Sequence, residues 1–559
     1  MARFARTLRR PAAAVALAAV TACGGEARTP FVETITEEAL RADLHALSAG
    51  SMAGRLVGTP SLDEASDWIA DRFSSLGLEP VGDDGGYDQR FDLVWFDLAG
   101  GDRLDVGGGA LAPGQGWTPS NAGAAGEASG PVVFAGFGIV EPRLGWDDYR
   151  GVDVTGRIVL VLDREPGVAD PASPFDGVVT AEASRTWRKA LAAQERGARG
   201  ILFVRDVQNR GDIDDWAGYH DAQWPAERRR IERFSLGVWA ERVTIPAAEI
   251  SVALAEQLLA NTAVSLGELA SAAEASADGH GVTAPVRAYA SFRTSVRRNV
   301  TPGRNVLGLV RGSDPEVADE VVIVGAHHDH NGTDGETVYN GADDDGSGTV
   351  GVMAVAGAFA RAAEEGRRPR RSVLFAVWDA EERGLLGAWH YTERPVIPLD
   401  RTVAKLNLDM IGRHEEVPAD GGGRFRGLEV QTAESNANAI NILGYSRTPE
   451  LAGAVAAANA ALAEEGSIDR ALTLRSRYDN NASNLLRRSD HWPFLQSGVP
   501  AVWFHTGLHP DYHTPFDDPE RIEYEKMTRI VRLVYRTARD LADADGRPSL
   551  EPMGVHPPS

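Results

Sequence analysis

Residues 321–348, VVIVGAHHDHNGTDGETVYNGADDDGSG, decide the fold of this 559-residue chain. They begin with the short β-branched run Val321–Val324, which is typical of a parallel strand covered on both faces. In open α/β sheets, ligands bind beyond the carboxyl ends of the strands, and that position here carries the cluster His327, His328, Asp329 and His330. The sequence therefore predicts a buried strand that ends in a binding site.

The residue types in this stretch favour a metal. Imidazole and carboxylate groups together suit zinc. If the strand continues briefly, His327 and Asp329 point the same way, so Asp329 can accept the second imidazole proton and fix the ring. Three acids follow in GADDDGSG, before a helical pattern, and one of them can bridge two metals. Alone, the first motif reads as a hydrogen-bonded pair and the second as a helix cap; their closeness favours a metal site.

Composition limits the possible partners. The chain is 43% hydrophobic and 25% charged, which is typical of a soluble globular protein, and it is too long for one ordinary core. Two domains are expected, the larger one discontinuous. The formal net charge of -23 argues against nucleic acid and against an anionic membrane surface as partners.

The N-terminus has the pattern of an export signal. Residues 1–22 combine four arginines with the short apolar run AAAVALAAV, which is too short to span a bilayer. Cys23, the single cysteine, follows Val20, Thr21 and Ala22 in a pattern that resembles the lipobox of bacterial lipoproteins. We expect an exported lipoprotein anchored to the membrane through Cys23; the alternative is an ordinary signal peptide with a stray cysteine.

The rest of the chain divides by composition. Residues 23–107 show two amphipathic helices and an edge strand at 91–98, and residues 286–545 alternate strands and helices. Between them, residues 108–285 carry Gly/Ala-rich loops and short β runs such as PVVFAGFGIV, RIVLVLD and GARGILFV, a pattern that resembles the protease-associated (PA) domain. Trp187 and Trp216 of this insert are expected to pack rather than to form a contact surface. Residues 546–559 are expected to be a disordered tail.

Strand ends and adjoining loops of the α/β region offer a ligand set, which consists of His327, Asp344, Glu382, Asp409 and His513. Two metals that share a carboxylate need about this many groups. We pair His327 with Asp409, and Glu382 with His513, across Asp344. Glu381 is then free to act as the general base, because adjacent residues in a tight turn can face metal and water respectively.

The motifs GAHHDH, GADDDGSG, DAEERGLLG, NLDMIG, SDH and YHTPFD, in this order, resemble the M28 family of zinc aminopeptidases over roughly residues 34–105 and 286–545. The resemblance implies an α/β fold with a doubly wound, mostly parallel sheet and helices on both faces. It also implies two zinc ions per chain, peptide substrates, Asp344 as the bridging ligand and Asp329 as the orienting acid. Some members carry a PA insert.

One position departs from the family pattern. Some members place an oxyanion-stabilising tyrosine three residues before the serine of SDH, where this chain has Leu486, so Tyr478 or Tyr512 is the expected substitute. His328 and His330 are expected only to line the loop, because the ligand set is complete without them.

Rival functions remain open at the level of sequence. A carboxypeptidase would present arginines to the substrate carboxylate, with Arg487, Arg488 and Arg521 as candidates, and a glutaminyl cyclase would need one zinc ion. A receptor-like ectodomain without catalysis would be expected to lack ligands or the base, and none is missing.

Overall fold

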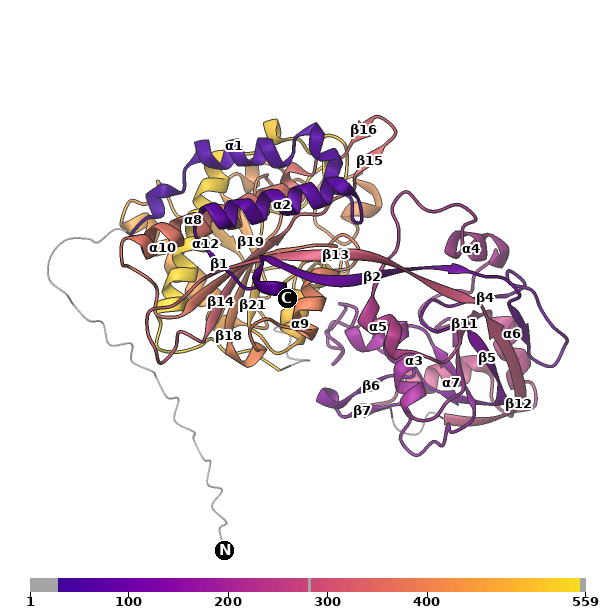
Figure 1. The fold of residues 1–559 in the computed structure, drawn as a ribbon. Coiled ribbons are helices and arrows are strands. Elements are labelled where there is room, and N and C mark those ends of the chain that lie inside the picture. Colours follow the sequence, from indigo (N-terminus) through magenta and orange to yellow (C-terminus); the bar gives the residue numbers. More distant parts are fainter. Residues whose placement is uncertain (1–28, 280–282, 553–559) are drawn as a thin grey trace, which may run out of the picture.

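The computed structural model describes residues 29–279 and 283–552. The expected signal segment 1–22 and Cys23 therefore lie outside the described residues, as do residues 553–559. The described residues form two bodies, each built on its own sheet (Figure 1). Two long antiparallel strands, β2 (Asp88–Leu98) and β13 (Val296–Val310), run from one body into the other and are paired from Val306↔Asp88 to Val296↔Leu98.

Within the described residues, ten strands form the sheet of the larger body. Its order is β10 (Ser235–Leu236), β2, β13, β17 (Ser372–Trp378), β14 (Val321–His327), β18 (Thr402–Leu408), β21 (Ala501–His505), β19 (Ala439–Leu443) and β20 (Thr473–Arg475), with β1 (Glu79–Pro80) paired to β13.

Parallel pairing in this sheet is concentrated at its centre. β14 pairs in parallel with β17 and β18, and β18 pairs in parallel with β21. The flanking pairs β13–β17, β2–β13 and β19–β21 are antiparallel. The α/β class and the buried parallel strand at Val321–Val324 are confirmed, but the expectation of a mostly parallel sheet is wrong. The edge pair β19–β20, which is joined through α10, is parallel as well, so the sheet is mixed, with parallel pairs where the connection crosses over.

Helices cover both faces of the larger sheet, so the doubly wound layering is confirmed (Figure 1). Alternation along β14 explains why: Val322 and Val324 pack into the core on one face, and Val321 and Ile323 into the core on the other. One face is covered by α1 (Glu37–Leu47), α2 (Pro60–Ser75), α8 (Gly348–Glu364), α10 (Pro449–Glu464) and α12 (Tyr524–Asp543). The other is covered by α9 (Leu386–Glu393), α11 (Trp492–Gln496) and α5 (Gly237–Arg242).

The smaller body, here called the insert, comprises the described part of residues 103–294 apart from β10 and α5, which belong to the larger body. Its sheet runs β3 (Arg103–Asp105), β12 (Thr283–Thr294), β5 (Gly126–Ala135), β8 (Ile158–Leu162), β9 (Gly200–Val204), β11 (Ala247–Ile250) and β4 (Trp117–Pro119). This sheet reaches past both predicted limits of 108 and 285. Its helices are α3 (Thr186–Glu195), α4 (Trp216–Gln223), α6 (Val252–Leu259) and α7 (Leu266–Glu274). Short strand pairs are β6 (Val140–Glu141) with β7 (Trp146–Asp147), and β15 (Thr333–Asp334) with β16 (Thr337–Val338) in the larger body.

Three local expectations can be compared with the structure. β2 is not the outermost strand, because the two-residue strand β10 pairs with its outer side. Residues 546–552 are not a free tail, since Glu551 N donates to the Arg447 carbonyl and Arg547 pairs with Glu320 at 2.7 Å. Trp187 stacks on Trp239 with ring centroids 5.0 Å apart, as the packing interpretation predicts.

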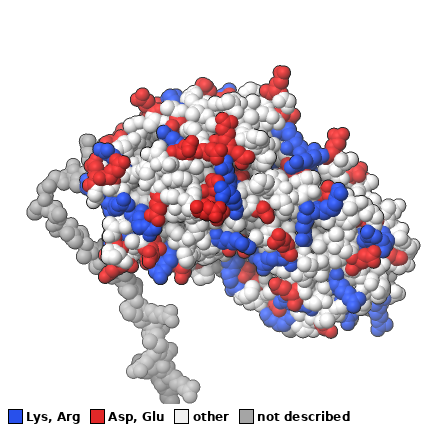
Figure 2. All heavy atoms as spheres, viewed as in Figure 1, with Lys and Arg blue, Asp and Glu red and all other residues white. Residues whose placement is uncertain are grey.

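The surface carries both signs of charge. On the face shown in Figure 2, acidic and basic side chains are interspersed rather than gathered into one large patch of a single sign. None of the helices in the described ranges has both the length and the apolar character that crossing a bilayer requires.

Candidate metal centre

The predicted ligands converge at the carboxyl ends of the central parallel strands. His327 is the last residue of β14, Asp409 directly follows β18, and the turn that carries Glu381 and Glu382 follows β17. Because these three strands are parallel neighbours, their ends meet at one edge of the sheet. The topology therefore brings together residues that lie far apart in the sequence.

A first cluster surrounds the imidazole of His327. Its Nε2 lies 3.3 Å from Asp344 Oδ1, 3.6 Å from Glu381 Oε2 and 3.9 Å from Asp409 Oδ1. Asp409 is held from behind by the Ser489 hydroxyl, which donates to its Oδ2 at 2.5 Å. These ligand atoms are almost completely buried.

A second cluster lies on the other side of Asp344. His513 Nε2 is 2.9 Å from Asp344 Oδ2 and 3.1 Å from Glu382 Oε1. One oxygen of Asp344 therefore faces each cluster, and the five predicted ligands fall into the two groups in which the sequence analysis paired them.

The geometry fits bound zinc. His327 Nε2 and His513 Nε2 are buried and have no hydrogen-bond partner, although carboxylate oxygens surround them. Ligand atoms at about 2.0–2.1 Å from a tetrahedral zinc ion lie roughly 3.4 Å from one another. The separations of 2.9–3.9 Å in the two clusters bracket this value. The side chains are arranged around shared points rather than bonded to one another, which is how metal ligands are arranged.

The crowding of acids leaves a strong electrostatic signature. Burial raises the pKa of Asp409 to about 8, and burial together with nearby carboxylates raises the pKa of Glu381 well above its usual range. Burial opposes protonation of His513, but Glu382 and Asp344 outweigh it and raise its pKa to about 10. A divalent cation would offset this excess of negative charge.

Asp329 lies where an orienting acid was expected, but it acts differently. His327 Nδ1 hydrogen-bonds to the main-chain carbonyl of Asp329 at 3.2 Å, whereas the carboxylate Oδ1 is 3.6 Å away. The carboxylate instead accepts the backbone N–H groups of Glu381 at 2.9 Å and Glu382 at 3.2 Å. Asp329 therefore fixes both the imidazole and the turn that carries the predicted base.

The three acids of the GADDDGSG turn have separate roles. Asp345 accepts the backbone N–H groups of His327, Gly348 and Met410. Asp343 accepts the N–H of Gly412 at 2.6 Å. Only Asp344 has its carboxylate between the two clusters.

Arg55 ties the ligand-bearing loops together. Its side chain is fully buried, and it donates to four main-chain carbonyls at 2.7–3.0 Å, those of Leu47, His328, Asn340 and Gly341. Burial lowers its pKa to about 10, so it stays charged at neutral pH beside the acids of the site. No local sequence pattern reveals which carbonyls this arginine reaches.

A small pocket opens beside the clusters. It has a volume of about 20 Å³, and its lining includes Arg488 and Tyr512 as well as four acids, namely Asp344, Glu381, Glu382 and Asp409. Arg488 Nη2 donates to the Tyr512 hydroxyl oxygen at 2.9 Å. Of the two tyrosines considered from sequence, Tyr512 lines the pocket, whereas the Tyr478 hydroxyl donates to Glu415.

The other arginines considered from sequence do not line this pocket. Arg487 donates to Glu182 of the insert at 2.8 Å, and Arg521 pairs with Asp511 on the surface. The two remaining histidines of the loop also differ from each other. His328 uses both ring nitrogens in contacts to Ser66 and to the Trp378 carbonyl, whereas His330 lies against the second cluster.

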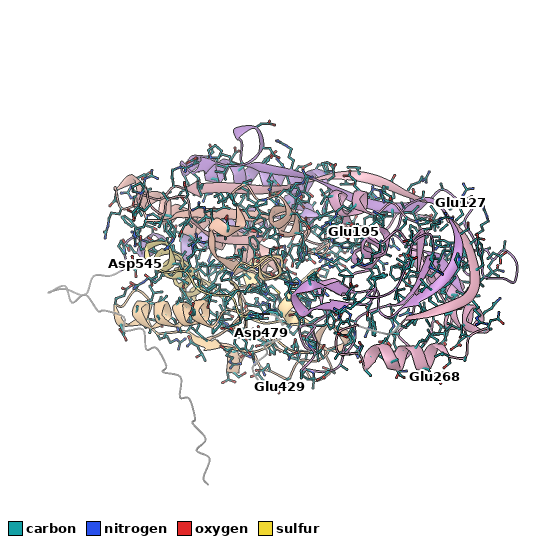
Figure 3. All side chains as sticks on the ribbon, turned by 90° about the horizontal axis from the view of Figure 1, so that it is seen from below. Glu127, Glu195, Glu268, Glu429, Asp479 and Asp545 are labelled. Atoms are coloured by element: carbon teal, nitrogen blue, oxygen red, sulfur yellow. The ribbon has the colours of Figure 1, made fainter. Side chains whose placement is uncertain are left out.

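Two segments of the insert reach the loops around the site. Asn480 and Asn484 accept the backbone N–H groups of Val178 and Thr180, just ahead of the pocket-lining residues. Asp479, labelled in Figure 3 close to where the insert meets the larger body, fixes the same loop by accepting from Gly444 N at 2.7 Å. On the other side, Arg230 donates to the carbonyl of Asn331 at 2.8 Å.

Known peptidases are similar to this chain in sequence. Residues 305–538 match the model of Peptidase family M28. The chain is 28% identical over 515 residues to the probable glutamate carboxypeptidase AMP1 of Arabidopsis thaliana, which covers 83% of this chain and 61% of that protein. It is 25% identical over 252 residues to aminopeptidase YwaD of Bacillus subtilis, which covers 44% of this chain and 46% of that protein.

A solved structure, an aminopeptidase from Aneurinibacillus sp. strain AM-1, is 18% identical with a TM-score of 0.47, over 95% of this chain and 98% of that chain. The chain spans about three fifths of the length of the two curated relatives that it matches over most of its own length.

The two carboxylate–imidazole clusters have the ligand types of a zinc site. The match to peptidase family M28 covers residues 305–538, the part of the chain that carries both clusters.

Replacement of Arg55 by lysine should destabilise the protein by about 2–4 kcal/mol, because one compact ammonium cannot serve four carbonyls on separate segments and leaves buried acceptors unpaired. Metal retention should fall with it, since the carbonyls lie in the ligand-bearing loops. Thermal unfolding and metal content after dialysis measure both effects. Arg41→Lys, in an exposed pair with Glu37, is the matched control. Unchanged stability and metal content in Arg55→Lys would show that other contacts hold these loops.

Proposed function

We propose that the protein is an exported, di-zinc aminopeptidase that removes N-terminal residues from peptides. One zinc ion would be held by His327, Asp344 and Asp409, and the other by Asp344, Glu382 and His513. The observation that carries the proposal of two ions is the position of Asp344, whose two oxygens face different imidazoles at 3.3 and 2.9 Å.

When bound, zinc supplies Lewis acidity that makes water nucleophilic at neutral pH and polarises a carbonyl oxygen. Glu381 stands beside the first cluster, with its backbone fixed by Asp329 and its Oε2 3.6 Å from His327 Nε2. It is placed to take a proton from the attacking water and to return it to the leaving amine. Glu382, its neighbour, faces the second cluster instead. Glu381 would therefore act as the base and Glu382 as a zinc ligand.

Tyr512 is placed to stabilise the developing oxyanion. Arg488 donates to the Tyr512 hydroxyl oxygen, which leaves the hydroxyl hydrogen free to be donated into the pocket. The ring is fixed by stacking on His513, with centroids 3.9 Å apart. A donor held in this way before the substrate arrives stabilises charge without having to reorganise.

The lining of the pocket supports cleavage at an N-terminus. Three of the four carboxylates in the lining are proposed zinc ligands, so the fourth, Glu381, is the one left to attract a terminal ammonium.

A carboxypeptidase is the second candidate. Arg488 is a guanidinium in the pocket lining, and a planar guanidinium is the group that holds carboxylates best. Several of the relatives, including the two matched over most of this chain, are named as probable glutamate carboxypeptidases.

A substrate panel decides between the two candidates. Aminoacyl chromogenic amides with a free amine should be cleaved, and acetylation of that amine should lower kcat/KM by roughly 100-fold or more, because a buried carboxylate would lose its charged partner. Chelation should abolish cleavage, and added zinc should restore it, with two zinc ions per chain by metal analysis. Preferential cleavage of N-blocked peptides with a free C-terminus would instead establish the carboxypeptidase. Saturation with one ion would reject the di-zinc assignment.

Glu381→Gln should lower turnover by roughly two to four orders of magnitude, because the amide keeps the shape of the side chain but cannot accept a proton. Zinc content should barely change. Glu382→Gln should lose zinc as well as rate, because a neutral amide is a poor zinc ligand. Turnover and metal content, measured on both variants, separate the two roles. Near-full turnover of zinc-loaded Glu381→Gln would mean that base and ligand are assigned wrongly.

We also propose membrane anchoring through Cys23, on the basis of the basic segment, the short apolar run and the Val20–Cys23 pattern. Cys23→Ser should move the protein from the membrane fraction to the soluble fraction, because it removes the thiol that would carry the lipid. Fractionation with immunodetection measures the shift. Thr21→Ser, a conservative change in the same segment that keeps the thiol, is the matched control. Membrane association that persists in Cys23→Ser would reject the anchor.

A further inference from the structure

His330 lies fully buried beside the second cluster and is not bonded like an ordinary core histidine. Neither ring nitrogen has a hydrogen-bond partner, although the side chain is 0% exposed. Its neighbour His328 is equally buried but places Nε2 2.6 Å from the Ser66 hydroxyl and Nδ1 2.8 Å from the Trp378 carbonyl. A buried imidazole without partners is costly unless something else satisfies it.

The ring of His330 is directed at the second cluster. Its Nδ1 lies 2.9 Å from Glu382 Oε1 and 3.9 Å from Asp344 Oδ2. His330, Asp344 and Glu382 each offer a ligand atom within 4.8 Å of the others. The ring packs edge-on against His513, with centroids 5.6 Å apart, so both imidazoles border the same two carboxylates.

His330 shares its local geometry with the ligands already assigned. His327, His513 and His330 each have a ring nitrogen close to carboxylate oxygens but without a hydrogen bond to them. This is the expected arrangement when nitrogen and oxygen atoms face a common ion. His328, two residues away, does not have it.

The backbone around His330 makes room for this position. A Cβ on Gly341 would lie 2.5 Å from Cγ of the His330 ring, and Gly341 has a φ of +53°. A glycine is therefore required there on both counts. The His330 main chain is fixed as well, since its N–H donates to the Arg55 carbonyl at 3.0 Å.

We propose that His330 is a further ligand of the second ion, through Nδ1. This inference rests on the proposed di-zinc function and deepens it. The second ion would then have His330, His513, Glu382 and Asp344, whereas the first has His327, Asp409 and Asp344. Catalytic zinc sites keep three protein ligands and an open position, and closed sites have four. The first site is thereby assigned as the open, more labile one, and the second as the tightly held one.

X-ray absorption at the zinc edge tests the assignment without relying on activity. The fully loaded protein is dialysed against a weak chelator until one ion per chain remains, and the imidazoles bound to the retained ion are counted. Two imidazoles are expected, from His330 and His513. A count of one in the unmodified protein would overturn the inference, and this measurement depends on no variant.

His330→Gln provides the second arm. It should reduce the count to one and weaken retention of that ion roughly 100-fold or more, because loss of a partner behind a ligand already costs about 10- to 100-fold. His328→Gln, a neighbouring change of the same size, should leave the count at two. A retained ion with the same affinity in His330→Gln would overturn the assignment.

The two proposals fail in different ways. A protein that takes up only one zinc ion at saturation contradicts the di-zinc function itself. A protein that takes up two ions, with one imidazole on the retained ion, leaves the di-zinc function intact and removes only His330 from the ligand set.

Discussion

The carboxylate of Asp344 faces two buried imidazoles at once, and the structure around it serves to keep it there. Its backbone N–H is held by Asp517, which also accepts the N–H of Asp343. Asp345 and Asp343 accept backbone N–H groups of neighbouring segments. Their carboxylates therefore stabilise the turn and do not face the two clusters as Asp344 does. A group of acids this close together is costly to bury, and it is tolerated because N–H donors, Arg55 and, in the holoprotein, metal ions offset the charge.

Arg55 also holds the loops that carry the candidate ligands. It enters from the segment between α1 and α2, yet its guanidinium joins the carbonyls of the His327–His330 loop and of the Asn340–Gly341 turn. Four donors in one rigid fork can fix two loops relative to each other, which a flexible ammonium cannot do. The N-terminal helices are therefore part of the site as well as a cover for the sheet.

The insert is connected to the same region from two sides. Its residues Val178 and Thr180 are bonded to the loop before Arg488, and its Arg230 is bonded to Asn331, whose side chain donates to Glu382 at 3.2 Å. These hydrogen bonds connect the insert to the pocket lining and to Glu382. The long strands β2 and β13, which belong to both bodies, form a further connection between them.

The sequence by itself predicted the central strands, the helices that follow them and the five side chains that lie together at the candidate metal centre. It did so because apolar runs, turns and metal-binding residue types recur locally and in order, as in Val321–Val324 followed by His327. Only the tertiary structure decided that Asp343 and Asp345 accept backbone N–H groups, that His330 lies against the second cluster while His328 does not, and that Asp329 holds His327 through its carbonyl. It also decided that the flanking strands are antiparallel. These outcomes depend on side-chain direction and on contacts between segments far apart in the chain, and local sequence patterns do not encode either.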